Sequence, residues 1–289
     1  MFELSLIERA TRDLEWAVRS PLLSSETPPG YSELVSQSST LPLPDNDTAS
    51  RRHPPIGRYF ERLLAHWLGA QESVSELECN LPVQEGKRTL GELDLIFRLG
   101  DTWYHWELAI KFYLGVGQLE STENWHGPLG RDRLDIKLNR LHAHQLKLLE
   151  TDTGRTLLVD RGIPEISSHM VLKGYLFHPL DAWLAKRFTV PKEINPGHGN
   201  GFWAHLAEIE KVVKLSCKWV LLPKADWLAP AQSTQAMPST DFKTAIHSYF
   251  STDSRPPLIA AIDDKGQEIA RVFIVPNNWA PCPTRRHPY

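Results

Sequence analysis

Apolar residues recur every three or four positions in three segments, and this spacing predicts helices over residues 2–18, 57–69 and 131–150. The Ser20-Pro21 step is expected to end the first helix, because the residue before a proline avoids the helical region. Gly69 is a typical stop for the second. Between these two helices, residues 24–55 are rich in Ser, Pro, Asp and Asn, and they predict a surface loop or linker.

Alternation of apolar and polar residues predicts strands at 74–81, 91–99, 103–114 and 169–177. The second and third alternate best, and the Gly100-Asp101 step between them is typical of a hairpin turn. Together with the helices at 57–69 and 131–150, these strands give the order α-β-β-β-α-β. This order predicts an α/β core with a mixed four-stranded sheet over residues 56–178.

Beyond His178 the pattern predicts shorter elements. Helices are expected in HPLDAWLAKRF and HLAEIEKVVK, and strands in CKWVLLP, RPPLIAAID and ARVFIVP. A DDKG turn joins the last two strands. The expected organisation is therefore an N-terminal helix and linker (1–55), the core (56–178), and an α+β extension packed on the core (179–289).

Composition narrows the class of protein. Hydrophobic residues make up 41% of the 289 positions, enough for a sizeable buried core. The three cysteines, Cys79, Cys217 and Cys282, are far apart and form no CxxC pair, which favours a reducing cytoplasm over a disulfide framework. No apolar run approaches the roughly 20 residues that span a bilayer, so no membrane partner is expected. The net charge is −3, so any phosphate binding must come from a local patch or a metal ion.

The strand pattern brings together three residues with a shared chemistry. Asp94 lies on the strand at 91–99, and Glu107 and Lys111 share one face of the strand at 103–114. Phosphodiester hydrolysis needs a hard cation such as Mg²⁺ or Mn²⁺, whose ligands are carboxylate oxygens. A nearby lysine orients the attacking water or stabilises the charge of the transition state. The alternative is a solvated strand face with a cross-strand ion pair.

The helix at 131–150 carries a basic stripe. Arg133, Lys137 and Arg140 recur at helical spacing, followed by His144 and Lys147. Such a stripe beside a metal site would follow a phosphate backbone, although an ordinary solvated helix face has the same pattern. Gln145 falls among the leucines of the buried register, where its amide needs a partner. It is expected either to reach the site or to cap a backbone group.

The motifs GELDLIF and WELAIKF resemble the core motif of the PD-(D/E)XK, or restriction-endonuclease-like, superfamily. A closer likeness, to a bacterial family of uncharacterised function within that superfamily, is carried by RDLEWAVRSPLL, WELAIKFYL, WHGPLGRDRLDIKLNRLHAHQL and KGYLFHP. The superfamily likeness covers about residues 56–178, and it implies an αβββαβ core and a metal-dependent nuclease.

The resemblance also implies roles for individual residues. Asp94 and Glu107 match the metal-binding acids and Lys111 matches the lysine. Glu61, on the preceding helix, matches an acid that completes the metal shell in many members, and an exposed helix position explains it equally well. Glu92 shares the face of Asp94 and is a candidate outer ligand.

Ala109 departs from the motif, which has an acid and a lysine separated by one residue. Glu107 and Lys111 would lie about 13 Å apart along the strand instead of about 7 Å, from the usual rise per residue. Two hypotheses follow. The first is a metal-dependent nuclease or phosphodiesterase acting on nucleic acid, and the second is a catalytically inactive nuclease-fold protein that binds nucleic acid or a protein partner. A purely structural role for the acids is a third.

Overall fold

A computed structural model describes residues 2–49, 55–232 and 236–281 of the chain. It is a mixed α/β protein with a large mixed sheet and helices, as the sequence predicts. The chain forms two compact units: Met1–Ile110 with Lys137–Gly174 make the first, and Lys111–Ile136 with Tyr175–Tyr289 the second. This division differs from the predicted boundaries at residues 56 and 178. The 14-residue strands β3 (Thr102–Gly115) and β5 (Ile166–Pro179) each contribute residues to both units.

The first unit is built on a meander of long strands. β1 (Val74–Glu85) pairs antiparallel with β2 (Arg88–Leu99), β2 pairs antiparallel with β3, and β5 follows β3 in the sheet. The tight turn between β2 and β3 contains Gly100 at φ 59°, a left-handed conformation that glycine adopts without steric cost. The predicted hairpin is therefore confirmed. β1 and β2 are both longer than predicted.

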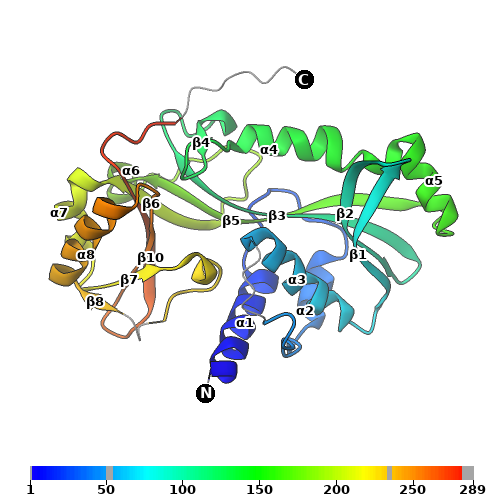
Figure 1. Ribbon diagram of the computed structural model, residues 1–289, viewed down its shortest axis with the longest axis horizontal. Coiled ribbons are helices and arrows are strands. Elements are labelled where there is room, and N and C mark those ends of the chain that lie inside the picture. The colour runs from blue at the N-terminus through cyan, green and yellow to red at the C-terminus, as the bar shows by residue number, and fades with distance from the viewer. Residues whose placement is uncertain (1, 50–54, 233–235, 282–289) are drawn as a thin grey trace. The chain divides into compact units, whose positions relative to one another are not determined.

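Three helices cover one side of strands β2 and β3 in the first unit, while α5 (Asp152–Asp160) lies on the other side (Figure 1). They are α1 (Phe2–Arg19), α2 (Tyr31–Gln37) and α3 (Ile56–Gly69). The predicted apolar stripe of α3 is buried, and so is that of α1 from Ala10 onward, because α3 packs against α1 and β1. The fully buried members are Ala10, Leu14 and Ala17 of α1 and Phe60, Leu63, Leu64 and Trp67 of α3.

Helix α2 lies in the segment predicted to be a loop. It begins after Gly30, whose positive φ turns the chain, and it buries Tyr31 and Leu34. The Tyr31 ring packs against Trp67 and Trp106. Burial of these side chains stabilises a helix that its polar composition does not predict. Residues 50–54 of the predicted linker lie outside the described residues.

The helix predicted over 131–150 is interrupted. α4 spans Leu134–Arg140 and continues as a π-helical turn at Leu141–Gln145, closed by the Leu146 N–H donating to the Leu141 carbonyl at 2.9 Å. A short 3₁₀ turn at Leu148–Glu150 then leads into α5, which the sequence did not predict. Leu148 and Leu149 pack on apolar residues of β1 and β2, and this packing fixes the end of the segment.

The second unit contains the remaining strands. β5 and β6 (Gly199–His205) are parallel, as are β6 and β10 (Glu268–Val275). The antiparallel strands β9 (Leu258–Ile262), β7 (Lys218–Leu222) and β8 (Met237–Pro238) follow. The two-residue strand β4 (Trp125–His126) pairs with β3. The predicted strands at β7, β9 and β10 are thus confirmed, whereas β6 was not predicted.

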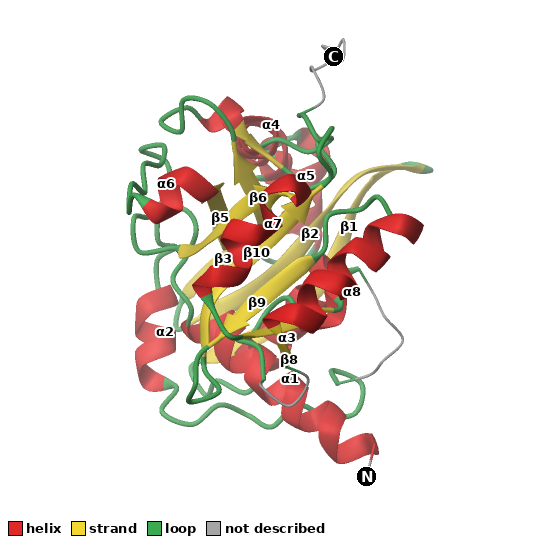
Figure 2. Cartoon of the chain, turned by 90° about the vertical axis from the view of Figure 1, so that its left-hand side faces the viewer, coloured by secondary structure: helices red, strands yellow, loops and turns green. Residues whose placement is uncertain are grey.

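Short helices accompany these strands. α7 (Ile209–Val212) and α8 (Ser239–Thr252) lie against β6, β10 and β9 (Figure 2), and their apolar residues join the core of the unit. α6 (Leu180–Leu184) and α7 confirm the two predicted helices, and α8 was not predicted. Among the described residues of the unit, short 3₁₀ turns lie at Thr122–Asn124, Leu206–Glu208, Val213–Leu215 and Lys224–Asp226.

Cys79 and Cys217 are exposed free thiols, and Cys282 lies outside the described residues. Over the described part of the chain, none of the helices combines the length and the apolar character needed to cross a bilayer.

Candidate functional site

Two carboxylates face each other across neighbouring strands of the first unit. In the antiparallel pairing of β2 and β3, Leu95 lies opposite Trp106, and Asp94 and Glu107 come directly beyond this last pair, close enough for the charge of Glu107 to act on Asp94. The sequence fixes this register through the short Gly100-Asp101 turn. The Leu108 N–H donates to Asp94 Oδ2 at 2.8 Å and orients that carboxylate.

Burial makes this pair electrostatically unusual. The Glu107 side chain is almost fully buried and Asp94 is half-buried. Burial raises the pKa of Asp94, and the charge of Glu107 raises it further. Burial likewise raises the pKa of Glu107, whereas the positive charge of Lys137 lowers it. Two adjacent buried carboxylates therefore favour either a shared proton or a cation.

The π-helical turn brings Gln145 to this pair. Gln145 Nε2 donates to Glu107 Oε1, and Lys137 Nζ donates to Gln145 Oε1 at 3.1 Å. The extra residue in the turn rotates Gln145 relative to a regular helix, so that its amide points at the strand. Of the two expectations for Gln145, the structure shows the one in which it reaches the acid pair.

A pocket of about 500 Å³ opens at these residues. Asp94, Glu107 and Gln145 line it together with basic side chains from the helical segment, namely Lys137, Arg140 and His144. Arg140 and His144 are exposed to solvent. The pocket thus has carboxylates at its base and positive or titratable groups at its rim, an arrangement suited to a cation with an anionic ligand.

Arg58 holds the other two predicted acids at the edge of this pocket. Its guanidinium lies 2.9 Å from Glu61 Oε2 and 2.7 Å from Glu92 Oε2. The charge of Glu61 nevertheless raises the pKa values of both Asp94 and Glu107, so it is close enough to act on them. Within the described residues, no group of three or more His, Cys, Asp or Glu side chains is arranged to hold a metal ion. The expected Asp94–Glu107–Glu61 shell is thus not found among the described residues, and Glu61 is paired with Arg58.

Lys111 does not line the pocket. It belongs to the second unit, where its Nζ donates to Asp132 Oδ2 at 2.6 Å, and the Tyr113 hydroxyl donates to the same oxygen at 3.3 Å. Arg133 is also in the second unit and forms a two-bonded ion pair with Asp135. Of the predicted basic stripe, Lys137, Arg140 and His144 line the pocket, whereas Arg133 and Lys147 do not. Lys137 is the amine whose charge favours ionised Glu107.

His105 is a residue of the site that the sequence did not single out. It lies two positions before Glu107 on the same face of β3 and is completely buried. Its Nδ1 lies 3.1 Å from Ser168 Oγ, and its Nε2 lies 3.7 Å from Glu107 Oε2. Burial lowers the pKa of His105 to about 4, which keeps the ring neutral. The strand alternation places His105 on the same face as Glu107, and this pattern was the feature of the sequence that could have identified His105 as a site residue.

The donor set at the acid pair fits a hard divalent cation. Glu107 Oε2 is buried and makes no hydrogen bond with a described residue. An orphaned buried carboxylate oxygen beside a second raised-pKa carboxylate is costly unless a proton or cation neutralises it. Asp94 and Glu107 are therefore the residues that could hold Mg²⁺ or Mn²⁺, since oxygen ligands are what these ions prefer.

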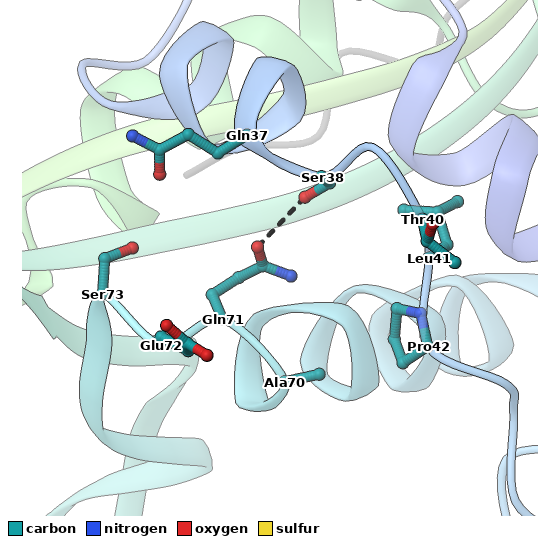
Figure 3. Close-up of a pocket in the computed structure, with 9 residues that line it drawn as sticks. All are labelled: Gln37, Ser38, Thr40, Leu41, Pro42, Ala70, Gln71, Glu72 and Ser73. Atoms are coloured by element: carbon teal, nitrogen blue, oxygen red, sulfur yellow. Dashed lines mark hydrogen bonds between the residues drawn. The ribbon is translucent and has the colours of Figure 1, made fainter.

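A second pocket of about 540 Å³ in the first unit has a different character. It lies at the ends of α2 and α3, where the Ser38 hydroxyl donates to Gln71 Oε1 at 3.0 Å (Figure 3). Glu72 is the only ionisable side chain among its lining residues. A lining with a single carboxylate supplies neither paired acids nor a phosphate-binding cation, so the chemistry of the first pocket is not duplicated here.

The model of the family described as "Domain of unknown function (DUF1853)" matches residues 12–275, and the chain belongs to that family. Neither a curated protein nor a solved structure matches the chain.

Proposed function

We propose that this DUF1853 protein is a divalent-metal-dependent nuclease, or nuclease-like phosphodiesterase, centred on Asp94 and Glu107. One observation carries the proposal: two opposed carboxylates of raised pKa line a pocket whose other wall is the basic face of the α4 segment. Apart from the two-residue strand β4 and the helix α5, the element order is α3-β1-β2-β3-α4-β5. This order supports the proposal, because it is the order of the restriction-endonuclease-like core that the motifs resemble.

The two carboxylates would hold Mg²⁺ or Mn²⁺. A bound divalent ion supplies a Lewis acid that acidifies water and neutralises phosphate charge. The residues of the chain itself would position this chemistry. The Leu108 N–H orients Asp94, and the Gln145 amide orients Glu107. Glu61 adds negative charge at the edge of the pocket.

Lys137, rather than Lys111, would supply the amine. Ala109 occupies the motif position where a lysine would project beside the acid, and Lys111 is bonded to Asp132. Lys137 comes from the helical segment, is linked to Glu107 through Gln145, and lines the pocket. Its ammonium group would stabilise the developing negative charge or steady the attacking water.

The rim of the pocket is suited to a nucleic-acid backbone. Arg140 and His144 lie one helical turn apart and are both exposed at the pocket. A guanidinium group pairs well with phosphate oxygens. Such contacts fix the position of a nucleic acid without reading its sequence. The substrate class is therefore nucleic acid, contacted chiefly through its phosphates.

The test is a cleavage assay of the full chain on single- and double-stranded DNA and RNA, with Mg²⁺, with Mn²⁺ and with a chelator. We expect metal-dependent cleavage of at least one substrate, and its loss in D94N while the variant keeps a cooperative melting transition. Glu72, in the second pocket, provides the matched control, and E72Q should cleave like the wild type. Cleavage that persists in D94N or in chelator would reject the assignment.

A second candidate is a nuclease-fold protein that binds nucleic acid without cutting it. The Lys111–Asp132 ion pair and the open three-acid shell favour it, since a lysine bonded to a half-exposed carboxylate is expected of an inactive site. This protein would bind the same substrates in chelator, lose affinity in R140A, and show no cleavage with any metal.

A further inference from the structure

Two buried polar atoms without hydrogen bonds face each other beside the acid pair. They are His105 Nε2 and Glu107 Oε2, and 3.7 Å separates them. Both side chains are nearly or completely buried. A buried donor or acceptor without a partner costs about 1–3 kcal/mol. One hydrogen bond between these two atoms would satisfy both, after a shift of less than about 1 Å to the usual length.

The Ser168 hydroxyl can form a hydrogen bond with either tautomer of the His105 ring, so the environment of Nε2 selects between them. This hydroxyl is both a donor and an acceptor, and Nδ1 of His105 lies 3.1 Å from it. At a pH where Glu107 is ionised, a proton on Nδ1 would leave bare Nε2 facing a carboxylate oxygen, and the two lone pairs would repel. If the hydroxyl donates to Nδ1 instead, the proton is on Nε2 and points at Glu107.

We propose that His105 is a positioning residue for Glu107: its Nε2–H donates to Oε2, and the Ser168 hydroxyl holds the ring in the tautomer that allows this. The inference rests on the proposed function in that an oriented Glu107 serves a metal ion. It adds a histidine and a serine outside the acid-and-lysine set.

The arrangement completes a polar chain through the first unit. It runs from Ser168 on β5 through His105 and Glu107 on β3 to Gln145 and Lys137 on the helical segment. Glu107 then receives one donor on each oxygen, Nε2 of Gln145 on Oε1 and Nε2 of His105 on Oε2. Donors on both oxygens fix the plane of the carboxylate and leave its remaining lone pairs for the cation. Partners of this type are typically worth 10–100-fold in metal affinity.

The chain contains a matched control pair. Ser167 and His169 flank Ser168 on β5, and the Ser167 hydroxyl lies 2.7 Å from His169 Nε2. Ser167 is exposed and His169 is half-buried. Like the His105–Ser168 contact, this contact joins a serine hydroxyl to a histidine ring, but both of its residues lie on β5 and the contact is exposed. Changes at Ser167 and His169 therefore report the general effect of removing a serine–histidine contact.

The first experiment observes the proton directly. In long-range ¹H–¹⁵N spectra of protein labelled with ¹⁵N-histidine, at about pH 8, we expect His105 to carry its proton on Nε2. S168A should shift the Nδ1 resonance of His105, and S167A should leave it unchanged. E107Q should shift the Nε2 resonance. A proton on Nδ1, or an Nε2 signal indifferent to E107Q, would overturn the inference, and neither measurement requires activity.

The second experiment measures Mn²⁺ affinity by electron paramagnetic resonance. We expect H105L to bind Mn²⁺ about 10–100-fold more weakly than the wild type, and H169L to bind it normally. H105Q keeps an N–H donor near Oε2 and should recover affinity to within about threefold. A merely structural role of the ring would weaken H105Q as much as H105L, and that result would reject positioning.

The two proposals fail differently. If the wild type binds Mn²⁺ but H105L and H169L both match it, the positioning role is wrong while the metal site stands. If the wild type binds no Mn²⁺, the proposed function is wrong, and the histidine spectra still decide whether His105 donates to Glu107.

Discussion

Strand β3 presents an acid and a base on one face, and the two residues have opposite environments. Glu107, in the first unit, is 2% exposed, lies against another carboxylate and has one oxygen without a hydrogen bond. Lys111, in the second unit, forms a 2.6 Å ion pair with Asp132, and both side chains are partly exposed at 27% and 43%. The Lys111–Asp132 pair balances one positive and one negative charge, whereas the Asp94–Glu107 pair brings two acids together and favours a shared proton or a bound cation. The binding free energy of a cation is expected to be most favourable at a site where the protein leaves negative charge unpaired.

The largest expected effect is a difference in activity between variants of Glu107 and of Asp132. E107Q should lower kcat/KM for metal-dependent cleavage by roughly 10³-fold, because loss of one group that acts on the transition-state charge costs on the order of 10²–10³. D132N should change it by less than about threefold. Steady-state cleavage rates at saturating Mg²⁺ measure both. Equal losses in the two variants would erase the distinction between the sites.

The next effect separates the two lysines. K137M should reduce kcat by about 10²-fold, as expected for removal of one stabilising charge, whereas K111M should stay within about threefold of the wild type. Single-turnover cleavage is the appropriate measurement, since it isolates the chemical step. K147M, on the same helical segment but outside the pocket, controls for the change in net charge. A K111M loss larger than that of K137M would restore Lys111 as the catalytic lysine.

A smaller effect concerns stability and pH. The pKa values of Asp94 and Glu107 are raised in the folded protein, so both groups favour folding below their unfolded pKa values of about 4. Their contribution is lost as the pH rises through the raised folded values. D94N should therefore melt higher than the wild type at pH 8 by about 2–4 °C, the shift that about 1 kcal/mol produces in a domain of 150–250 residues.

Melting curves of D94N and the wild type across this range test the sign. The difference should shrink as the pH falls toward 4, and it should also shrink when Mg²⁺ is added, because the ion stabilises only the wild-type site. A D94N variant that melts lower than the wild type at pH 8 would contradict the idea of an uncompensated acid pair.

The smallest effect is expected at the Lys111–Asp132 ion pair. A double-mutant cycle of K111M and D132N should give a coupling free energy of at most about 1 kcal/mol, the usual value for partly exposed pairs. Urea unfolding measures it. A coupling several times larger would mean that Lys111 and Asp132 hold more of the second unit than their exposure indicates.

The sequence predicted the acid pair because a single short turn fixes it. Once Gly100-Asp101 is identified as a hairpin turn, the antiparallel pairing brings Asp94 and Glu107 to neighbouring positions just beyond the Leu95–Trp106 pair. The alternating pattern of β2 and β3 was likewise sufficient for their faces. Local geometry therefore determines the centre of the candidate site.

Partners that come from distant segments could not be predicted in the same way. The contact of Lys111 with Asp132 depends on the path of the loop at 115–130, and Ser168 reaches His105 from a strand 63 residues further along the chain. Helix α2 forms because Tyr31 packs on two tryptophans, a tertiary contact absent from its local sequence. The division into two units could not be predicted for a related reason. The alternating pattern identifies β3 and β5 as strands, but it does not show that each strand contributes residues to both units.

The π-helical turn at Leu141–Gln145 makes the site sensitive to chain length as well as to side-chain identity. A regular helix needs one residue fewer over the same rise, so removing His144 would turn Gln145 by about 100° and withdraw its amide from Glu107 while altering no residue that contacts either strand. Insertions and deletions in this segment thus act as a switch on the acid pair. In relatives of this chain, the spacing between Lys137 and Gln145 should be a better guide to a working site than the identity of either residue.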